Sequence, residues 1–227
     1  MSDELVFYTN PMSRGRIVRW MLEEVGRPYR TELLEYGTTI KAPAYLAINP
    51  MGKVPALRHG DAVVTEGAAI CCYLADAFPE AGLAPPPGDR LRGPYYRWMF
   101  FAAGPLEAAA TNKAFGFEVP AERKGMAGYG SLADVMSVLE AALSRPAYLV
   151  GDRFTAADLY VGSHIGWGIS FGTIEKRPAF ERYVERISTR PAALRARAID
   201  DALVSDNQQP APNGALRSAA MSGSGRA

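Results

Sequence analysis

Cysteine and histidine are scarce in this sequence, which has only two of each among 227 residues. The cysteines, Cys71 and Cys72, are neighbours in a helical pattern, where adjacent side chains point to different faces. No structural disulfide is therefore expected, and a reducing compartment is indicated. His59 falls in a turn and His164 in an apolar helical pattern, so the sequence shows no zinc-binding cluster and predicts no metal.

An excess of one charge sign and a long apolar run are also missing. The formal net charge is +1, and hydrophobic residues make up 48% of the chain against 22% charged residues. This composition is typical of a folded protein and lacks the basic footprint of a nucleic-acid-binding protein. No apolar run approaches the length of a membrane span, and residues 1–4 are acidic where a signal peptide would be basic. We therefore expect a cytoplasmic protein with neither a nucleic acid nor a membrane as its partner.

Strand and helix patterns alternate in the first part of the chain. Residues 5–8 form an apolar, strand-like run, and the helical spacing that starts near Ser13 stops at Gly26, with Pro28 just beyond it. The remaining predicted elements are strands at 29–34, 54–57 and 62–64, a short helix at 44–48 and a longer helix at 66–78. This order indicates an α/β unit.

A proline-rich segment at residues 79–89 marks a stiff linker between two domains. Beyond it only helical patterns follow, at residues 90–117, 121–143, 155–171, 179–189 and 192–203, which predicts an all-helical bundle. The predicted organisation is an α/β domain at 1–79, a linker at 80–89, an all-helical domain at 90–204 and a disordered tail at 205–227.

The stretch Asn49–Leu57, together with the helix start after it, has the features of a peptide-binding site. Pro55 lacks an N–H group, so it leaves a ladder position unpaired at the head of a short apolar strand. If the Val54–Pro55 bond is cis, the main-chain groups of Val54 face outward and can pair with an extended ligand. The free N–H groups of the helix expected from Glu66–Gly67 suit a carboxylate. Together these features indicate a site for a small acidic peptide.

The run "NPMGKVPAL…TEGAAICCYLADAFP" resembles the glutathione-binding half of the glutathione S-transferase family. The resemblance extends from Leu5 to about Leu203. It implies a thioredoxin-like first domain, glutathione as co-substrate and a homodimer. The motif "PMSRGRIVRWMLEEVG" is similar to the branches of the family that use a serine at this turn to activate the bound thiol.

Ser13 is therefore the predicted catalytic residue. It lies at an electropositive helix start, where a hydroxyl can donate a hydrogen bond to an anion and so favour the nucleophilic thiolate. Serine is also a favoured N-cap residue, which gives Ser13 a purely structural explanation. Thr9 or Asn10 in the same loop could replace or assist it. The loop has no cysteine, which argues against the disulfide-exchanging branches and against a thioredoxin-type redox enzyme.

The resemblance also implies roles in holding glutathione. Val54 would pair its backbone with the cysteinyl part, and Pro55 would be the cis residue that shapes the turn. Lys53 and Lys41 are the candidates for the glycyl carboxylate. Each lysine alone is better explained as a solvated surface charge, and only Lys53 is favoured further by its place inside the motif.

At the following helix, Glu66 would accept from the γ-glutamyl ammonium group, and the Gly67 N–H would hold the γ-glutamyl carboxylate. The commonest family pattern has serine where this chain has Gly67, so one hydroxyl contact is expected to be lost. Met12 is the candidate for the wall of the electrophile pocket, because methionine suits an adaptable apolar surface. Trp167 and Phe171 are interpreted as bundle core.

The predicted function is that of a glutathione transferase, typically a detoxification enzyme, in which the glutathione thiolate attacks an apolar electrophilic small molecule. One alternative keeps the fold without turnover, as a glutathione-binding or protein-interaction module. Another uses glutathione differently, as an isomerase, a peroxidase or a lyase.

Overall fold

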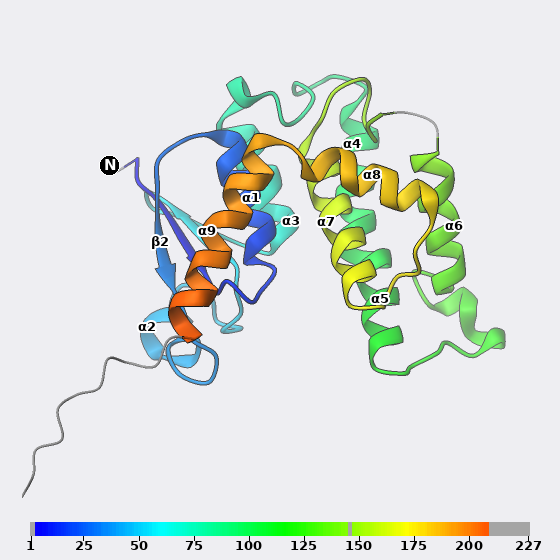
Figure 1. Ribbon diagram of the computed structural model, residues 1–227, viewed down its shortest axis with the longest axis horizontal. Coiled ribbons are helices and arrows are strands. Elements are labelled where there is room, and N and C mark those ends of the chain that lie inside the picture. The colour runs from blue at the N-terminus through cyan, green and yellow to red at the C-terminus, as the bar shows by residue number, and fades with distance from the viewer. Residues whose placement is uncertain (1–2, 145–146, 209–227) are drawn as a thin grey trace, which may run out of the picture.

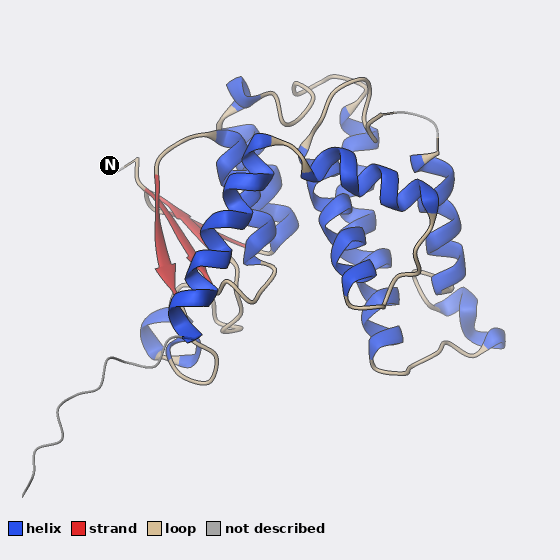
Figure 2. Cartoon of the chain, viewed as in Figure 1, coloured by secondary structure: helices blue, strands red, loops and turns tan. Residues whose placement is uncertain are grey.

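A computed structural model describes residues 3–144 and 147–208 of the chain (Figure 1). Strands and helices alternate first and helices alone follow, which confirms the predicted combination of a thioredoxin-like unit with a helical unit (Figure 2). The strands are β1 Leu5–Thr9, β2 Tyr29–Leu33, β3 Ala56–His59 and β4 Ala62–Thr65. The helices are α1 Gly15–Val25, α2 Pro43–Leu46, α3 Gly67–Ala77, α4 Arg92–Phe101, α5 Glu107–Ala114, α6 Leu132–Leu143, α7 Ala156–Ser170, α8 Pro178–Ser188 and α9 Pro191–Gln208.

The four strands form one mixed sheet in the order β2-β1-β3-β4. Strand β1 pairs parallel with β2 and antiparallel with β3, and β3 pairs antiparallel with β4. Strand β3 starts at Ala56 and not at Val54 as the sequence predicts, since Pro55 has no N–H to donate to the ladder. The first strand is almost wholly buried, so the sheet forms the floor of the first unit's core.

Helix α1 packs on this sheet and on α3 through its apolar face, where Ile17, Val18 and Met21 are buried. The helix ends at Gly26, which adopts φ 71° and donates its N–H to the Leu22 carbonyl. Only glycine fits well in that left-handed conformation. The helix start is equally constrained, because a Cβ at Gly15 would lie 1.9 Å from the Thr9 hydroxyl oxygen.

Two of the predicted long helices are interrupted. The pattern over 90–117 is divided by a π-helical segment at Ala102–Leu106, which contains Pro105. Proline cannot continue the regular hydrogen-bond ladder, and the wider turn accommodates it. The pattern over 121–143 is interrupted by a glycine-rich turn, and α6 begins only where the Ser131 hydroxyl accepts the Asp134 N–H at 3.2 Å.

Helix α7 begins with a capping box. The Asp158 carboxylate accepts the backbone N–H of Thr155 at 2.9 Å, and it also accepts the Tyr183 hydroxyl at 2.8 Å and the Leu149 N–H at 2.7 Å. These bonds fix the start of α7 against the loop before it and against α8. Their role is structural.

The C-terminal helix returns to the first unit. Helix α9, orange in Figure 1, lies along α1 beside the sheet. It runs on to Gln208, so residues 205–208, which the sequence assigned to the tail, are helical because the pattern of α9 continues without a stop signal. The rest of that predicted tail, 209–227, lies outside the described residues. No helix within the described ranges is long and apolar enough to cross a bilayer.

Candidate functional site

A cavity of about 290 Å³ lies where the first unit meets the helical unit. Its floor comes from the start of α1, the loop before β3 and the start of α3, and its far wall from the π-helical segment, α5 and α7. The lining residues are Arg14, Ile17, Asn49, Lys53, Val54, Pro55, Glu66, Gly67, Ala68, Ala103, Glu107 and Tyr160. Five of the eight residues proposed from the sequence thus come together: Lys53, Val54, Pro55, Glu66 and Gly67.

The loop before β3 presents an unpaired backbone edge to the cavity. The Val54–Pro55 peptide bond is cis. The carbonyl group of Lys53 accepts the Tyr45 hydroxyl at 2.5 Å and the Asn49 side-chain amide at 2.8 Å, which holds the loop in place. Within the described residues, the N–H and C=O groups of Val54 form no hydrogen bond. An extended ligand backbone can therefore pair there.

The start of α3 lines the same cavity as this edge. The first intrahelical acceptor is the Glu66 carbonyl, which receives the Ile70 N–H, so the N–H groups before Ile70 point out of the helix start without a partner. Glu66 has φ 67° and ψ 119° and is the only non-glycine residue with a positive φ in the described part of the chain. Backbone strain of this kind concentrates at functional sites.

We expect that strain to be measurable. Glu66→Gly and Glu66→Ala both remove the carboxylate, but only glycine adopts a positive φ without a Cβ penalty. The glycine variant should therefore be about 1 kcal/mol more stable than the alanine variant in urea unfolding. Equal unfolding free energies would show that the backbone at Glu66 is relaxed.

Two cations and two carboxylates surround the cavity. Arg14, at the start of α1, pairs with Glu107, at the start of α5, at 2.8 Å between Nη1 and Oε1. The ammonium group of Lys53 has neither an ion pair nor a hydrogen bond in the part of the chain that the structure describes. Together with Glu66, these groups complement a ligand that carries both carboxylates and an ammonium group.

Ser13 does not line this cavity. It is 8% exposed, its hydroxyl donates to the Asn10 carbonyl at 2.6 Å, and it accepts the Gly15 N–H at 2.9 Å. The Asn10 carbonyl also receives the Ser13 backbone N–H at 3.1 Å, so it keeps a donor if the hydroxyl turns away. Ser13 is thus a cap of the helix start, next to Arg14 in the cavity wall.

The two other candidates in this loop are engaged in holding it. The Asn10 side chain donates to the Leu34 carbonyl at 2.7 Å and accepts the Met12 N–H at 2.9 Å. Thr9 is fully buried at the end of β1. Neither side chain lines the cavity, and Ser13 is next in sequence to Arg14, which does.

Lys41 and Met12 lie away from the cavity lining. The Lys41 ammonium donates to the Met51 carbonyl at 2.9 Å, which ties two loops together. Met12 is 70% exposed on the outside of the turn before α1.

Comparison with known proteins agrees with this geometry. The family model of the glutathione S-transferase N-terminal domain matches residues 12–77, and that of the C-terminal domain matches residues 112–191. Glutathione S-transferase GstA of Escherichia coli O157:H7 is 31% identical over 149 residues, which are 65% of this chain and 73% of that protein. The chain belongs to the glutathione S-transferase family.

Solved glutathione S-transferases share the fold. A glutathione transferase from Methylococcus capsulatus aligns with a TM-score of 0.72 at 32% identity, covering 87% of this chain and 99% of the other. A sphingomonad glutathione S-transferase in complex with glutathione aligns with a TM-score of 0.72 at 26% identity, covering 86% and 98%.

Among the cavity residues of this glutathione S-transferase that were not found from the sequence, three carry a charged or hydroxyl group: Arg14, Glu107 and Tyr160. Arg14 lies inside the quoted serine motif. Its positive charge at an electropositive helix start was the signal that could have marked it as a site residue. Glu107 and Tyr160 belong to helices of the second unit, and no local pattern links them to the first.

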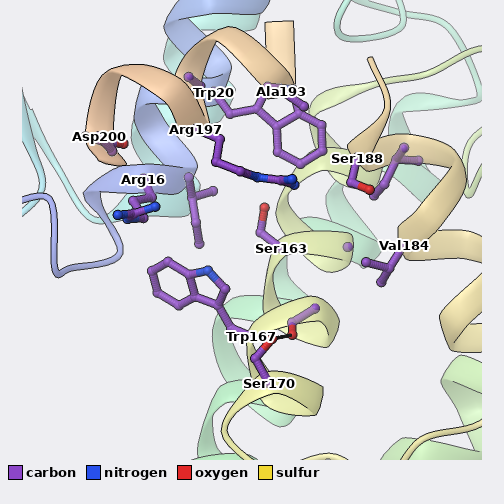
Figure 3. A pocket seen from close by; sticks show the side chains of 15 residues that line it. Arg16, Trp20, Ser163, Trp167, Ser170, Val184, Ser188, Ala193, Arg197 and Asp200 are labelled. Atoms are coloured by element: carbon purple, nitrogen blue, oxygen red, sulfur yellow. Dashed lines mark hydrogen bonds between the residues drawn. The ribbon is translucent and has the colours of Figure 1, made fainter. Parts of the chain in front are cut away.

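A second cavity, of about 350 Å³, lies between α1, α7, α8 and α9 (Figure 3). Ile17 lines both cavities, so helix α1 forms a common wall. Trp167 is only half-buried and extends into the second cavity, and Phe171 is 78% exposed, so the interpretation of these two side chains as bundle core is wrong. Phe171 lies just after the end of α7, where no neighbouring helix covers it.

Proposed function

We propose that this protein is a glutathione transferase that binds glutathione in the 290 Å³ cavity and promotes attack of its thiolate on an apolar electrophile. The observation that carries the proposal is the unpaired Val54 backbone edge facing the open N–H groups of α3. The first would pair with the cysteinyl part of glutathione, and the second would hold the γ-glutamyl carboxylate. Family membership supports both assignments.

The charged groups suit the ends of the tripeptide. Glu66 would accept the γ-glutamyl ammonium group, and the unpaired Lys53 would approach the glycyl carboxylate. Lys41 would act only indirectly, through its bond to the Met51 carbonyl. Arg14 would add positive potential beside the sulfur.

Ser13 is the proposed activating residue. Its hydroxyl would turn from the Asn10 carbonyl to the sulfur when glutathione binds, while the Ser13 backbone N–H keeps the carbonyl paired. The thiolate would then be stabilised by this donor and by the start of α1. Met12 would contribute to the electrophile side of the cleft, where its exposed side chain is free to adapt.

The domain organisation is proposed on the same basis: a glutathione-binding domain at 1–79, a linker at 80–89 and a helical domain at 90–204. Helix α9 belongs to the helical domain in sequence but packs on the first domain. Exposed Leu91, Tyr96 and Phe100 along α4 support an interface between two copies. A cytoplasmic role in detoxification would suit the free Cys71 and Cys72.

The test is a titration of glutathione into the protein. Calorimetry measures binding, and thiolate absorbance as a function of pH measures the pKa of the bound thiol. We expect binding and a bound thiol pKa below the free value of about 8.5. An activated aryl chloride should then give the thioether product. Absence of binding would contradict the proposal, and binding without conversion of any electrophile class would favour the non-catalytic alternative.

A further inference from the structure

The hydroxyl group of Tyr160 brings a polar group of the helical unit close to the start of α3. Tyr160 lies on α7, is 4% exposed and lines the 290 Å³ cavity. Within the ranges 3–144 and 147–208, its hydroxyl forms no hydrogen bond. It is not one of the fully buried unpartnered atoms, so the hydroxyl is reachable from the cavity and is free to donate to a ligand there.

Gly67 and Tyr160 are direct neighbours. A Cβ built on Gly67 would lie 3.4 Å from Cε2 of Tyr160 and 3.6 Å from its hydroxyl oxygen, which is ordinary van der Waals contact. Gly67 has no positive φ, so the backbone does not itself demand glycine there. The Tyr160 hydroxyl therefore lies beside a position whose own residue carries no side-chain donor.

We propose that the Tyr160 hydroxyl donates a hydrogen bond to the γ-glutamyl α-carboxylate of glutathione and so replaces the hydroxyl contact that Gly67 cannot make. This inference rests on the proposed function. The carboxylate would be held by the free N–H groups at the start of α3 on one side and by the Tyr160 hydroxyl on the other. The ligand would thereby connect the two units of the chain.

The surroundings keep Tyr160 a donor. Burial raises the pKa of Tyr160 above its ordinary value, and the nearby groups Cys71, Glu107 and Glu66 act in the same direction, against Arg14. The ring is held by His164, whose centroid lies 4.7 Å away. Burial lowers the pKa of His164 to about 4, so that side chain is neutral near pH 7 and does not compete for the carboxylate.

The first test is Tyr160→Phe, which keeps the ring and removes only the hydroxyl. A lost hydrogen bond to a carboxylate should weaken glutathione binding about 10- to 100-fold in calorimetry. The matched control is Tyr73→Phe, because the Tyr73 hydroxyl contacts His59 further along α3, away from the cavity. That control should bind like the wild type, and thermal unfolding shows whether each variant is folded.

A ligand change identifies the group that accepts. γ-Aminobutyryl-cysteinyl-glycine is glutathione without the γ-glutamyl α-carboxylate. If Tyr160 contacts that carboxylate, Tyr160→Phe should change the affinity for this analogue by no more than about twofold. An equal loss for glutathione and the analogue would show that Tyr160 only packs, and would overturn the inference.

A second substitution tests whether position 67 on α3 can supply the hydroxyl in place of Tyr160 on α7. Gly67→Ser in the Tyr160→Phe background places a hydroxyl at the same end of the cavity, since the ring at 3.4 Å leaves ordinary contact for a Cβ. We expect most of the lost glutathione affinity to return, while the affinity for the analogue stays unchanged. Wild-type protein that fails to bind glutathione would overturn the proposed function and this inference with it. If the wild-type protein binds glutathione and Tyr160→Phe binds it with the same affinity, this inference alone is overturned.

Discussion

Replacing Ser13 with alanine is expected to lower kcat/KM for glutathione conjugation by roughly 100-fold while glutathione still binds. The magnitude is that of removing one donor from a site that stabilises an anion. Because the hydroxyl would favour the thiolate over the thiol, the pKa of the bound thiol should rise in the variant toward its free value. Thiolate absorbance against pH measures this shift directly and separately from turnover.

A structural contribution has to be separated from this effect. Ser13 accepts the Gly15 N–H at 2.9 Å, so alanine also removes a helix cap, worth about 1 kcal/mol of unfolding free energy. A loss of stability without a change in the thiol pKa would mean that Ser13 is only a cap. The activating groups would then be the backbone of the helix start or Arg14.

Thr9→Val is the matched control in the same loop. It removes a buried hydroxyl whose only hydrogen bond to a described residue is a long one, 3.4 Å, to the Asn10 carbonyl. We expect no change in the pKa of the bound thiol. A shift as large as that of Ser13→Ala would reassign the role to Thr9.

The sequence predicted the parts of the fold that local chemistry decides. Gly26 ends α1 because only glycine suits φ 71°, and the capping box at Thr155 fixes where α7 begins. The predicted helix bounds are wrong where the helical hydrophobic pattern continues past a residue that interrupts the regular helix. Pro105 lies inside an apolar helical pattern, and only the structure shows that a π-helical segment accommodates it.

The part of the candidate site that comes from one short stretch of chain was predictable. Val54, Pro55 and Glu66 follow one another closely, so proline and helix-start chemistry was enough to place them. Glu107 and Tyr160 reach the cavity from α5 and α7 only after the helical unit has packed on the first. The sequence predicted the loss of a hydroxyl at Gly67 but not the neighbouring hydroxyl of Tyr160, which is far away in sequence and lies 3.6 Å from a Cβ built at that position.

The attachment of α9 gives the second large expected effect. The Arg19 guanidinium Nε donates to Asp200 Oδ1 at 2.7 Å, and both side chains are only 1% exposed. Arg19 also lies over the Phe7 ring at 5.2 Å, so the pair joins α9 and α1 to the sheet. Asp200→Ala would leave a buried, uncompensated guanidinium and should lower the free energy of unfolding by about 3–5 kcal/mol in urea.

The neighbouring ion pair is a control of matched geometry. Arg16 and Asp201 join the same two helices at the same 2.7 Å, but Asp201 is 57% exposed. Asp201→Ala should therefore cost less than about 1 kcal/mol. Since the distances are equal, burial alone would account for the difference between the two variants, and similar losses would contradict this explanation.

Replacing both buried partners distinguishes a pair that stabilises the fold from one that is costly only when broken. Burial raises the pKa of Asp200 even though Arg19 opposes that rise, so desolvation outweighs the attraction between the two charges. The double variant Arg19→Met, Asp200→Leu should accordingly recover most of the stability that Asp200→Ala loses. A double variant as unstable as the single one would mean that the pair itself holds α9 on the first unit.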